Sequence, residues 1–284
     1  MRLGITAALT DRDMSPVAFA RAVEDRGFYS FYLPEHTHLP IRADQPPALV
    51  DGVRAEDYRR GLCPLIALST AVPATERLRL GTGILLVAQH DPIVLAKQIA
   101  TLDHLSNGRV VLGIGFGWNR AEAEDHDVDF GRRHALVREY LLCMQALWSE
   151  EQAEFHGEFV DLPPAWAWPK PVQQPRPRVL VGGGSGAAVL DAVADYADGW
   201  MPIGGSGLGE AIPRLHRMAQ EKGRDPATLD VIPFGTVGTG PKLEHYASLG
   251  VAEVVLRVRS GTTDEMLTQL DALVPLVTLA ETLA

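Results

Sequence analysis

His36 follows an aromatic and apolar run, F-Y-S-F-Y-L-P, that predicts a strand over residues 28–34. An imidazole at a strand end can donate or accept a proton near neutral pH, or hydrogen-bond to the carbonyl group of a bound ring. The alternative is a histidine that merely caps the strand. We interpret His36 as a candidate catalytic and ligand-binding residue.

Glycines dominate residues 182–186, which follow an apolar strand and precede a predicted helix. Glycine lets backbone N–H groups face an anion at the positive end of a helix, and Ser185 adds a hydroxyl. The stretch also satisfies the loose pattern G-x-G-x-x-A of dinucleotide-binding folds. That pattern belongs to the first strand–helix turn, whereas four predicted strands come before this one. The position favours phosphate binding, with a structural glycine turn as the alternative.

Three alternating glycines, Gly113, Gly115 and Gly117, end another apolar run within residues 107–119. Glycine weakens a strand and marks places where a ligand or another backbone approaches closely. Trp118 and Asn119 follow at once and supply an aromatic face and an amide. The stretch predicts the floor of a binding site with Trp118 and Asn119 as substrate contacts, and an ordinary glycine-rich turn is the alternative.

Other reactive patterns are weaker. His36 and His38 have the spacing of two metal ligands on one strand. No clear third ligand is near them in the sequence, so no metal site is predicted. The acidic cluster over residues 124–129 is typical of a solvated loop. Cys63 and Cys143 lack partners at metal-ligand spacing. No G-x-S-x-G sequence supports acyl transfer.

The elements that must position these residues alternate along the chain. Periodicity predicts strands over residues 3–6, 28–34, 78–86, 107–119 in part, 179–181, 199–202, 229–234 and 253–258. Helices are predicted over residues 16–26, 63–72, 92–105, 132–148, 187–196, 209–222, 242–249 and 263–273. Eight strands that alternate with helices favour a single-domain α/β fold, a (β/α)8 TIM barrel, over an open sheet. In a barrel the carboxyl ends of all strands share one face, which brings the candidate residues together.

Two segments interrupt the alternation. Residues 37–61 are polar and proline-bearing and are predicted to form a long loop, which is uncommon without a function. Residues of about 150–177 carry six prolines and two tryptophans, with a hairpin expected at 154–159. We interpret them as an insertion between the fourth and fifth strands of one domain over residues 1–284.

The charge balance of 26 Lys and Arg against 36 Asp and Glu gives a net charge of -10, which argues against nucleic-acid binding. No stretch approaches the roughly 20 apolar residues of a membrane helix, and no signal peptide is recognisable. With two cysteines that need no disulfide, we expect a cytoplasmic protein without a membrane partner.

Five motifs in order along the chain resemble the bacterial luciferase-like superfamily, specifically its coenzyme F420-dependent oxidoreductase branch. They are L-P-E-H at 33–36, R-L-R-L-G-T-G-I at 77–84, D-P-I-V-L-A-K-Q at 91–98, L-D-H-L-S-N-G-R-V-V-L-G-I-G-F-G-W at 102–118 and D-G-W-M-P at 198–202. The resemblance implies a (β/α)8 barrel with a flavin or deazaflavin over its carboxyl face. The ring would rest on the backbone at Gly83 and Ile84, where family members often have a non-prolyl cis peptide.

The resemblance also implies roles for particular residues. The cofactor-binding set would be His36, Gly83, Ile84, Gly115, Gly117, Gly182, Gly183, Gly184, Ser185 and Pro202. The cofactor's anionic tail would have Arg120, Arg132 and Arg133 as further candidate partners. Trp118 occupies the place of a glutamate acid in the sugar-phosphate dehydrogenase of this branch, so an apolar or planar organic substrate is expected.

The interpretation favoured by these features is an F420-dependent oxidoreductase that transfers a hydride between the deazaflavin and an organic substrate. Two alternatives remain open from sequence: an FMN-dependent monooxygenase on the same barrel, and a non-catalytic flavin-binding protein. Family resemblance alone implies a homodimer. The substrate and the direction of reaction cannot be derived from the residues.

Overall fold

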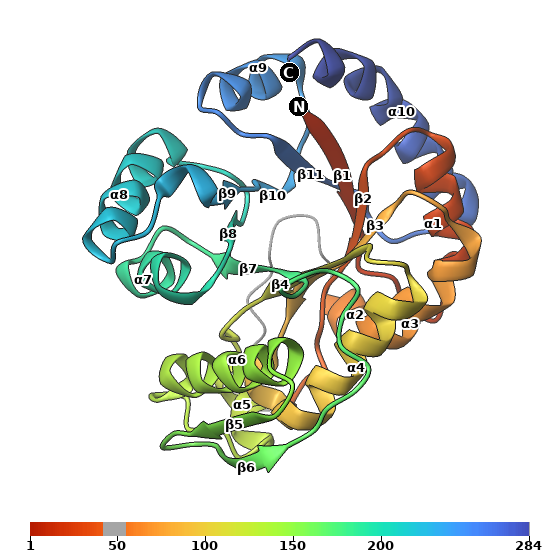
Figure 1. Cartoon of the computed structure of the whole chain (residues 1–284). Helices are drawn as coiled ribbons and strands as arrows, with labels where there is room; N and C mark the ends of the chain where they lie inside the picture. The colour runs from red at the N-terminus through yellow and green to blue at the C-terminus, as the bar shows by residue number, and fades with distance from the viewer. Residues whose placement is uncertain (42–54, 284) are drawn as a thin grey trace.

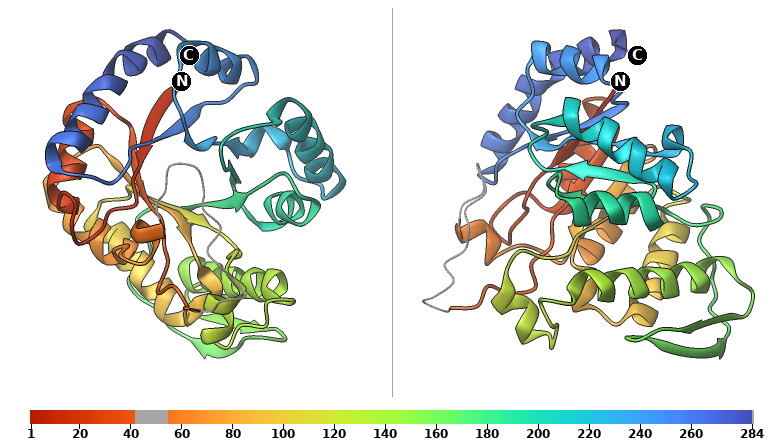
Figure 2. Two further views of the ribbon diagram at one scale, coloured as in Figure 1. Left: turned by 180° about the vertical axis from the view of Figure 1, so that it is seen from behind. Right: turned by 90° about the vertical axis from the view of Figure 1, so that its left-hand side faces the viewer.

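One curled sheet of nine parallel strands organises the chain (Figures 1 and 2). The computed structural model describes residues 1–41 and 55–283. The strand order is β10-β11-β1-β2-β3-β4-β7-β8-β9. The strands of this sheet are β1 (Arg2–Thr6), β2 (Ser30–Leu33), β3 (Arg79–Leu85), β4 (Val110–Ile114), β7 (Arg178–Gly183), β8 (Gly199–Pro202), β9 (Asp230–Val231), β10 (Phe234–Thr236) and β11 (Glu253–Arg257).

Helices cover the outer side of this sheet and connect its strands, as Figure 1 shows. They include α1 (Pro16–Asp25), α2 (Ala55–Tyr58), α3 (Pro64–Ala71), α4 (Pro92–Leu105), α5 (Arg120–Asp125), α6 (Arg133–Ser149), α7 (Ala187–Tyr196), α8 (Leu208–Glu221), α9 (Gly240–Ser248) and α10 (Thr263–Thr282). Every helix in the part of the chain that the structure describes is too short or too polar to cross a membrane.

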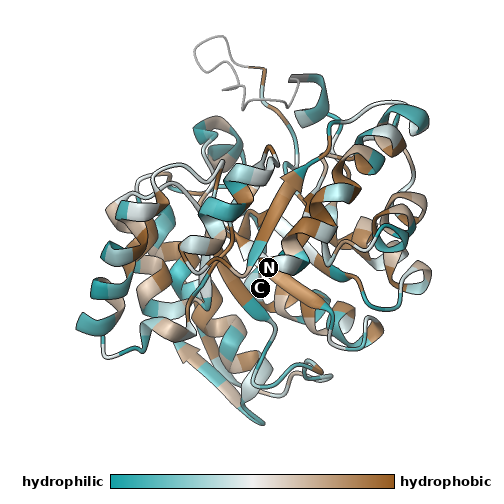
Figure 3. Cartoon of the chain, turned by 90° about the horizontal axis from the view of Figure 1, so that it is seen from above, coloured by the Kyte–Doolittle hydropathy of each residue, from teal (hydrophilic) through white to brown (hydrophobic). Residues whose placement is uncertain are grey.

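Apolar side chains pack on both faces of the sheet. A cluster inside the curl contains Tyr32, Val111, Leu180, Met201, Ile232, Phe234 and Val255. A larger cluster lies between the sheet and the helices and contains buried residues such as Phe19, Leu95 and Leu190. Figure 3 shows the same division, with hydrophobic strands inside and hydrophilic residues on the outer helices. The near-continuous apolar strands are those expected of a parallel sheet that is buried on both faces.

The segment predicted as one strand over residues 229–234 is divided into β9 and β10. Pro233 lies between them and has no N–H group for a sheet hydrogen bond. β9 pairs with β8, and β10 pairs with β11. An isolated parallel bridge between Ile203 and Phe234 links the end of β8 to β10.

Three other predictions need correction. Residues 55–58 form helix α2 inside the predicted loop over 37–61, of which residues 42–54 lie outside the described residues. α5, capped by Asn119, extends over Glu124 and Asp125, the first two residues of the predicted acidic loop. α10 continues past residue 273 to Thr282 with Pro275 inside it. The predicted hairpin is present as the antiparallel strands β5 (Ala153–His156) and β6 (Asp161–Ala165).

Candidate active site

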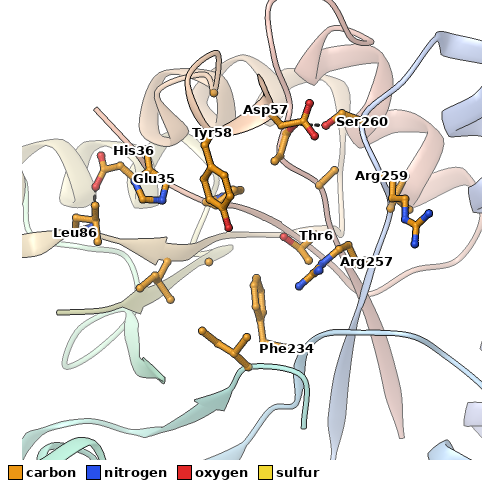
Figure 4. A pocket seen from close by; sticks show the side chains of 18 of the residues that line it. Thr6, Glu35, His36, Asp57, Tyr58, Leu86, Phe234, Arg257, Arg259 and Ser260 are labelled. Atoms are coloured by element: carbon orange, nitrogen blue, oxygen red, sulfur yellow. Dashed lines mark hydrogen bonds between the residues drawn. The ribbon is translucent and has the colours of Figure 1, made fainter. Parts of the chain in front are cut away.

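A pocket opens at the carboxyl ends of β11, β1, β2 and β3, with Phe234 at the start of β10 also in its lining (Figure 4). It encloses about 1020 Å³ of space, part of which is open to solvent. Most of the lining is apolar or aromatic, as in sites for organic ligands. Four residues of the predicted site line it: His36, Gly83, Ile84 and Trp118. Other lining residues include Glu35, Tyr58, Phe234 and Arg257.

His36 is held by a buried carboxylate. Its Nδ1 lies 2.7 Å from Oε2 of Glu122, and the side chain of Glu122 is 1% exposed. The other oxygen, Oε1, accepts the backbone N–H of Thr37 at 3.0 Å. A carboxylate can only accept hydrogen bonds, so Nδ1 of His36 carries a proton and donates it. Nε2 is then the ring nitrogen that is available to a ligand in the pocket, a common arrangement for a proton-transfer histidine.

Two aromatic rings fix the plane of His36 from the pocket side. Tyr58 and Trp118 both meet it edge to face, with ring centroids 5.0 and 5.5 Å away. These two rings also contact each other at 6.0 Å. Trp118 is 40% exposed and lines the pocket, so its indole offers a face to a planar ligand. The carboxylate and the rings together leave the imidazole little rotational freedom.

Glu35, next to His36 in the sequence, has a structural role. Its Oε2 accepts the backbone N–H of Leu86 at 2.7 Å, and its Oε1 lies 3.0 Å from Nε2 of His90. Its own N–H donates to the carbonyl oxygen of Ile84 at 3.1 Å. Because Glu35 is buried and its oxygens are bonded, it joins the end of β2 to the end of β3 and fixes that wall of the pocket.

Asn119 lies next to the pocket rather than in its lining. Its side chain is buried and accepts the N–H of Glu122 at 3.2 Å, which caps α5. The predicted role as a substrate contact therefore has no support in this position. Asn119 instead starts the helix that carries Glu122 to His36.

The peptide between Gly83 and Ile84 is cis, as family resemblance implied, and both residues line the pocket. The side chain of Ile84 is half-buried and lies against Gly115 and Gly182. A Cβ added to Gly115 would lie 1.8 Å from its Cδ1, and one added to Gly182 would lie 2.4 Å from its Cγ2. These two glycines therefore make room for the side chain of Ile84, and their contact with a cofactor stays a prediction.

The other predicted glycines differ in their surroundings. Gly113 leaves space for the Thr82 carbonyl oxygen and the Met201 sulfur. Gly117 has a φ of 74° and is required by the turn between β4 and Trp118.

The loop after β7 is open. A Cβ added to Gly184 or Gly186 would find no heavy atom within 4 Å. Ser185 is exposed there, Gly183 is half-buried, and Pro202 pairs with Gly183 at the buried end of β8. Helix α7 starts at this loop, and its N-cap Gly186 provides no side-chain hydrogen bond. The first N–H groups of α7 are thus left for other partners.

The three candidate arginines serve local contacts. Arg120 and Arg133 both lie over the ring of Phe130, at 4.5 and 3.7 Å from its centroid. Arg132 pairs with Glu158. None of the three lines the pocket.

Glu122 and Tyr58 are pocket-related residues that sequence reasoning missed, whereas Arg257 lies at the carboxyl end of a predicted strand, where site residues were expected. Glu122 has one usable signal, because it lies at the third position after Asn119, a residue type that caps helices, where a capped helix often has an acidic residue. Tyr58 has no such signal. It lies on the short helix α2, and its approach to the pocket depends on tertiary structure.

The sequence profile of the luciferase-like monooxygenase family matches residues 14–254. An uncharacterized protein of Mycobacterium tuberculosis is 43% identical over 272 residues, which cover 93% of this chain and 94% of that protein. An F420-dependent glucose-6-phosphate dehydrogenase of Kineococcus radiotolerans is 30% identical over 219 residues, which cover 75% of this chain and 60% of that enzyme.

Among solved structures, an F420-dependent secondary alcohol dehydrogenase in complex with an F420–acetone adduct has the same fold. Its TM-score is 0.79, and the alignment covers 98% of both chains at 17% sequence identity. At this level of identity the likeness concerns the fold.

Proposed function

The chain belongs to the luciferase-like monooxygenase family, and from this premise we propose that it is a coenzyme F420-dependent oxidoreductase. The proposed reaction is hydride transfer between the deazaflavin and a small organic substrate. The F420-dependent relative and the F420-dependent structural neighbour support this branch of the family. The observation that carries the proposal is His36, held by Glu122, in one pocket with the Gly83–Ile84 peptide.

The residues present fit such a cofactor. The backbone of Gly83 and Ile84 forms one wall of an apolar pocket, which suits a flat ring. The open backbone at Gly184 and the hydroxyl of Ser185, at the start of α7, suit a phosphate or another anion. When bound, the cofactor would supply the hydride carrier. Gly115 and Gly182 would act indirectly, by seating the side chain of Ile84.

His36 would move the proton that accompanies hydride transfer. Glu122 keeps Nδ1 protonated and directed away from the pocket, so Nε2 is the atom that would exchange a proton with the substrate. Trp118 would form the wall against which a planar or apolar substrate packs. Asn119 would contribute through α5, as a positioning residue for Glu122.

Finer features of the fold belong to the same proposal. β9 and β10 together would occupy one strand position, which makes the sheet an eight-stranded (β/α)8 barrel closed between β8 and β11. The segment over about 150–177, with its β5–β6 hairpin, would be an insertion into that barrel.

A homodimer is also proposed. α4 leaves Val94 and Leu105 54% and 63% exposed, and the carbonyl oxygen of Trp168 accepts a hydrogen bond from Lys97 of the same helix. Trp168 is itself 60% exposed. Exposed apolar surface of this kind is common at contacts between protein subunits, and we propose that a second copy covers it.

One alternative is an FMN-dependent monooxygenase. The name of the matching family supports a monooxygenase, and an FMNH2-dependent dimethylsulfone monooxygenase of Pseudomonas putida, 30% identical over 140 residues, supports FMN. A fluorescence titration of the purified chain with F420 and with FMN distinguishes the two cofactors. We expect saturable F420 binding. Tight FMN binding without measurable F420 binding would overturn the proposed function, and F420 binding with no turnover of any alcohol, aldehyde or enone offered would favour a non-catalytic flavin-binding protein.

A further inference from the structure

Three aromatic rings meet at steep angles on the His36 side of the pocket. The ring planes of Tyr58 and His36 are inclined at 82°, those of Trp118 and His36 at 69°, and those of Tyr58 and Trp118 at 70°. All three residues line the pocket. Faces that stand steeply to one another form a corner, so a flat ligand that is parallel to one ring presents its edge to the others. Both arrangements are favourable between aromatic rings.

Phe234 supplies a fourth ring from the other side of the pocket. In Figure 4 the side chains of Tyr58 and Phe234 project into the same space from opposite sides. Tyr32 holds the ring of Phe234 edge to face, at a centroid distance of 5.8 Å. A Cβ added to Gly83 would lie 2.3 Å from Cζ of Phe234, so this ring packs directly against the backbone of Gly83. The aromatic lining therefore extends from His36 across to β10.

Polar side chains of the lining are engaged within the fold. The hydroxyl groups of Thr6 and Ser260 both donate to backbone carbonyl oxygens, at 3.1 and 2.6 Å. Both oxygens of Glu35 accept hydrogen bonds, as described above. The charged residues Asp57 and Arg257 also interact within the chain. These contacts suit a ligand whose body is apolar, because the polar groups around it already have partners.

We propose that the substrate has a flat aromatic body with an alcohol or carbonyl oxygen at its edge. The body would lie in the corner formed by Tyr58 and Trp118. The oxygen at its edge would reach Nε2 of His36, since Nδ1 is bonded to Glu122. The proposed function requires only a planar or apolar substrate, which includes aliphatic compounds. This substrate class rests on the proposed function, whereas the preference for an aromatic body belongs to the pocket and needs no cofactor.

Two neutral ketones of similar size test this preference, 2-acetylnaphthalene and its fully hydrogenated analogue, 2-acetyldecahydronaphthalene. Ligand-observed NMR titrations of the full chain measure both affinities. The saturated ketone is the more hydrophobic of the two, so burial of apolar surface alone favours it. Contacts between aromatic rings reverse that order, and we expect the naphthalene to bind about three- to tenfold more tightly.

Variants assign the preference to particular rings. Trp118→Leu and Tyr58→Leu should each reduce it by about twofold or more, because each removes one ring and keeps an apolar side chain. Tyr58→Phe keeps the ring and should retain the preference, which separates the ring from its hydroxyl. Trp166→Leu is the matched control, because Trp166 follows β6 outside the pocket lining and is 76% exposed.

Equal affinities for the two ketones, or tighter binding of the saturated one, would overturn the proposal. So would a preference that survives both Trp118→Leu and Tyr58→Leu. Circular dichroism checks the folding of each variant, and should one of them unfold, the other decides. A chain that prefers the aromatic ketone and does not bind F420 refutes the proposed function and leaves the aromatic site standing. A chain that binds F420 without this preference keeps the proposed function and loses the substrate class.

Discussion

Two groups of glycines lie at the same end of the sheet in opposite surroundings. One group belongs to β3, β4 and β7 and the residues that follow them directly, and the other lies in the loops after β7 and β8. At Gly115 and Gly182 the space of the missing Cβ is filled by Ile84. At Gly184 and Gly204 a Cβ would find no heavy atom within 4 Å. Glycine thus serves packing between strands in one region and backbone exposure in the other.

The N-termini of the helices differ in the same way between these two regions. α4 and α5, on the side of His36, are capped by the side chains of Asp91 and Asn119. α7 and α8 start at Gly186 and Gly207, which supply no side-chain cap. On the side of His36, side-chain caps satisfy N–H groups at the helix N-termini, and this side forms a rigid wall. At α7 and α8, N–H groups are left for an anion to satisfy.

The largest expected effect concerns the rigid wall. His36→Ala should lower turnover by about 100-fold or more, because the proposed proton transfer loses its donor. His38→Ala is the matched control, since His38 is exposed and bonded to Asp125 outside the pocket. Steady-state kinetics with F420 and an accepted substrate measure both. Equal turnover in the two variants would refute the role of His36.

Substitution by alanine should reduce the free energy of unfolding at the packed glycines and leave it nearly unchanged at the open ones. Gly115→Ala places a Cβ where Ile84 lies and should reduce the free energy of unfolding by about 1–3 kcal/mol. Gly184→Ala meets no neighbour and should change it by less than about 0.5 kcal/mol. Urea unfolding followed by circular dichroism measures the difference. If both variants unfold at the same urea concentration, the contrast in packing is wrong.

The smallest effect concerns the open loop. Gly184→Asp places a negative charge near the first turn of α7 and should raise the dissociation constant for F420 by about two- to fivefold. Gly184→Asn has nearly the same shape without the charge and should bind F420 like the unchanged chain. Fluorescence titration compares them. An equal loss in both variants would mean that the loop acts by shape and does not bind an anion.

Much of the fold was predictable because strands and helices leave local patterns. The apolar runs at residues 3–6, 78–86 and 253–258 correspond to β1, β3 and β11. The division of β9 from β10 was missed because Ile232 is apolar and buried like a strand residue, while the adjacent Pro233 interrupts the hydrogen bonding.

The site was predictable in part. His36, Gly83, Ile84 and Trp118 line the pocket, since each follows or ends a strand. The glycine pattern of β4 correctly indicated a close approach, but a sequence does not reveal whether a ligand or a side chain from another strand approaches. The contacts of Glu122 and Arg257 depend on tertiary structure, so local periodicity of the sequence does not predict them.

The packing of Ile84 ties three positions to one shared volume. Its side chain occupies the space left by Gly115, the residue after β4, and by Gly182 of β7. Any larger residue at 115 or 182 requires a smaller one at 84, so substitutions at these positions should be compensatory. For an engineer who wishes to reshape the pocket floor, the practical unit of design is this trio, changed together in one library.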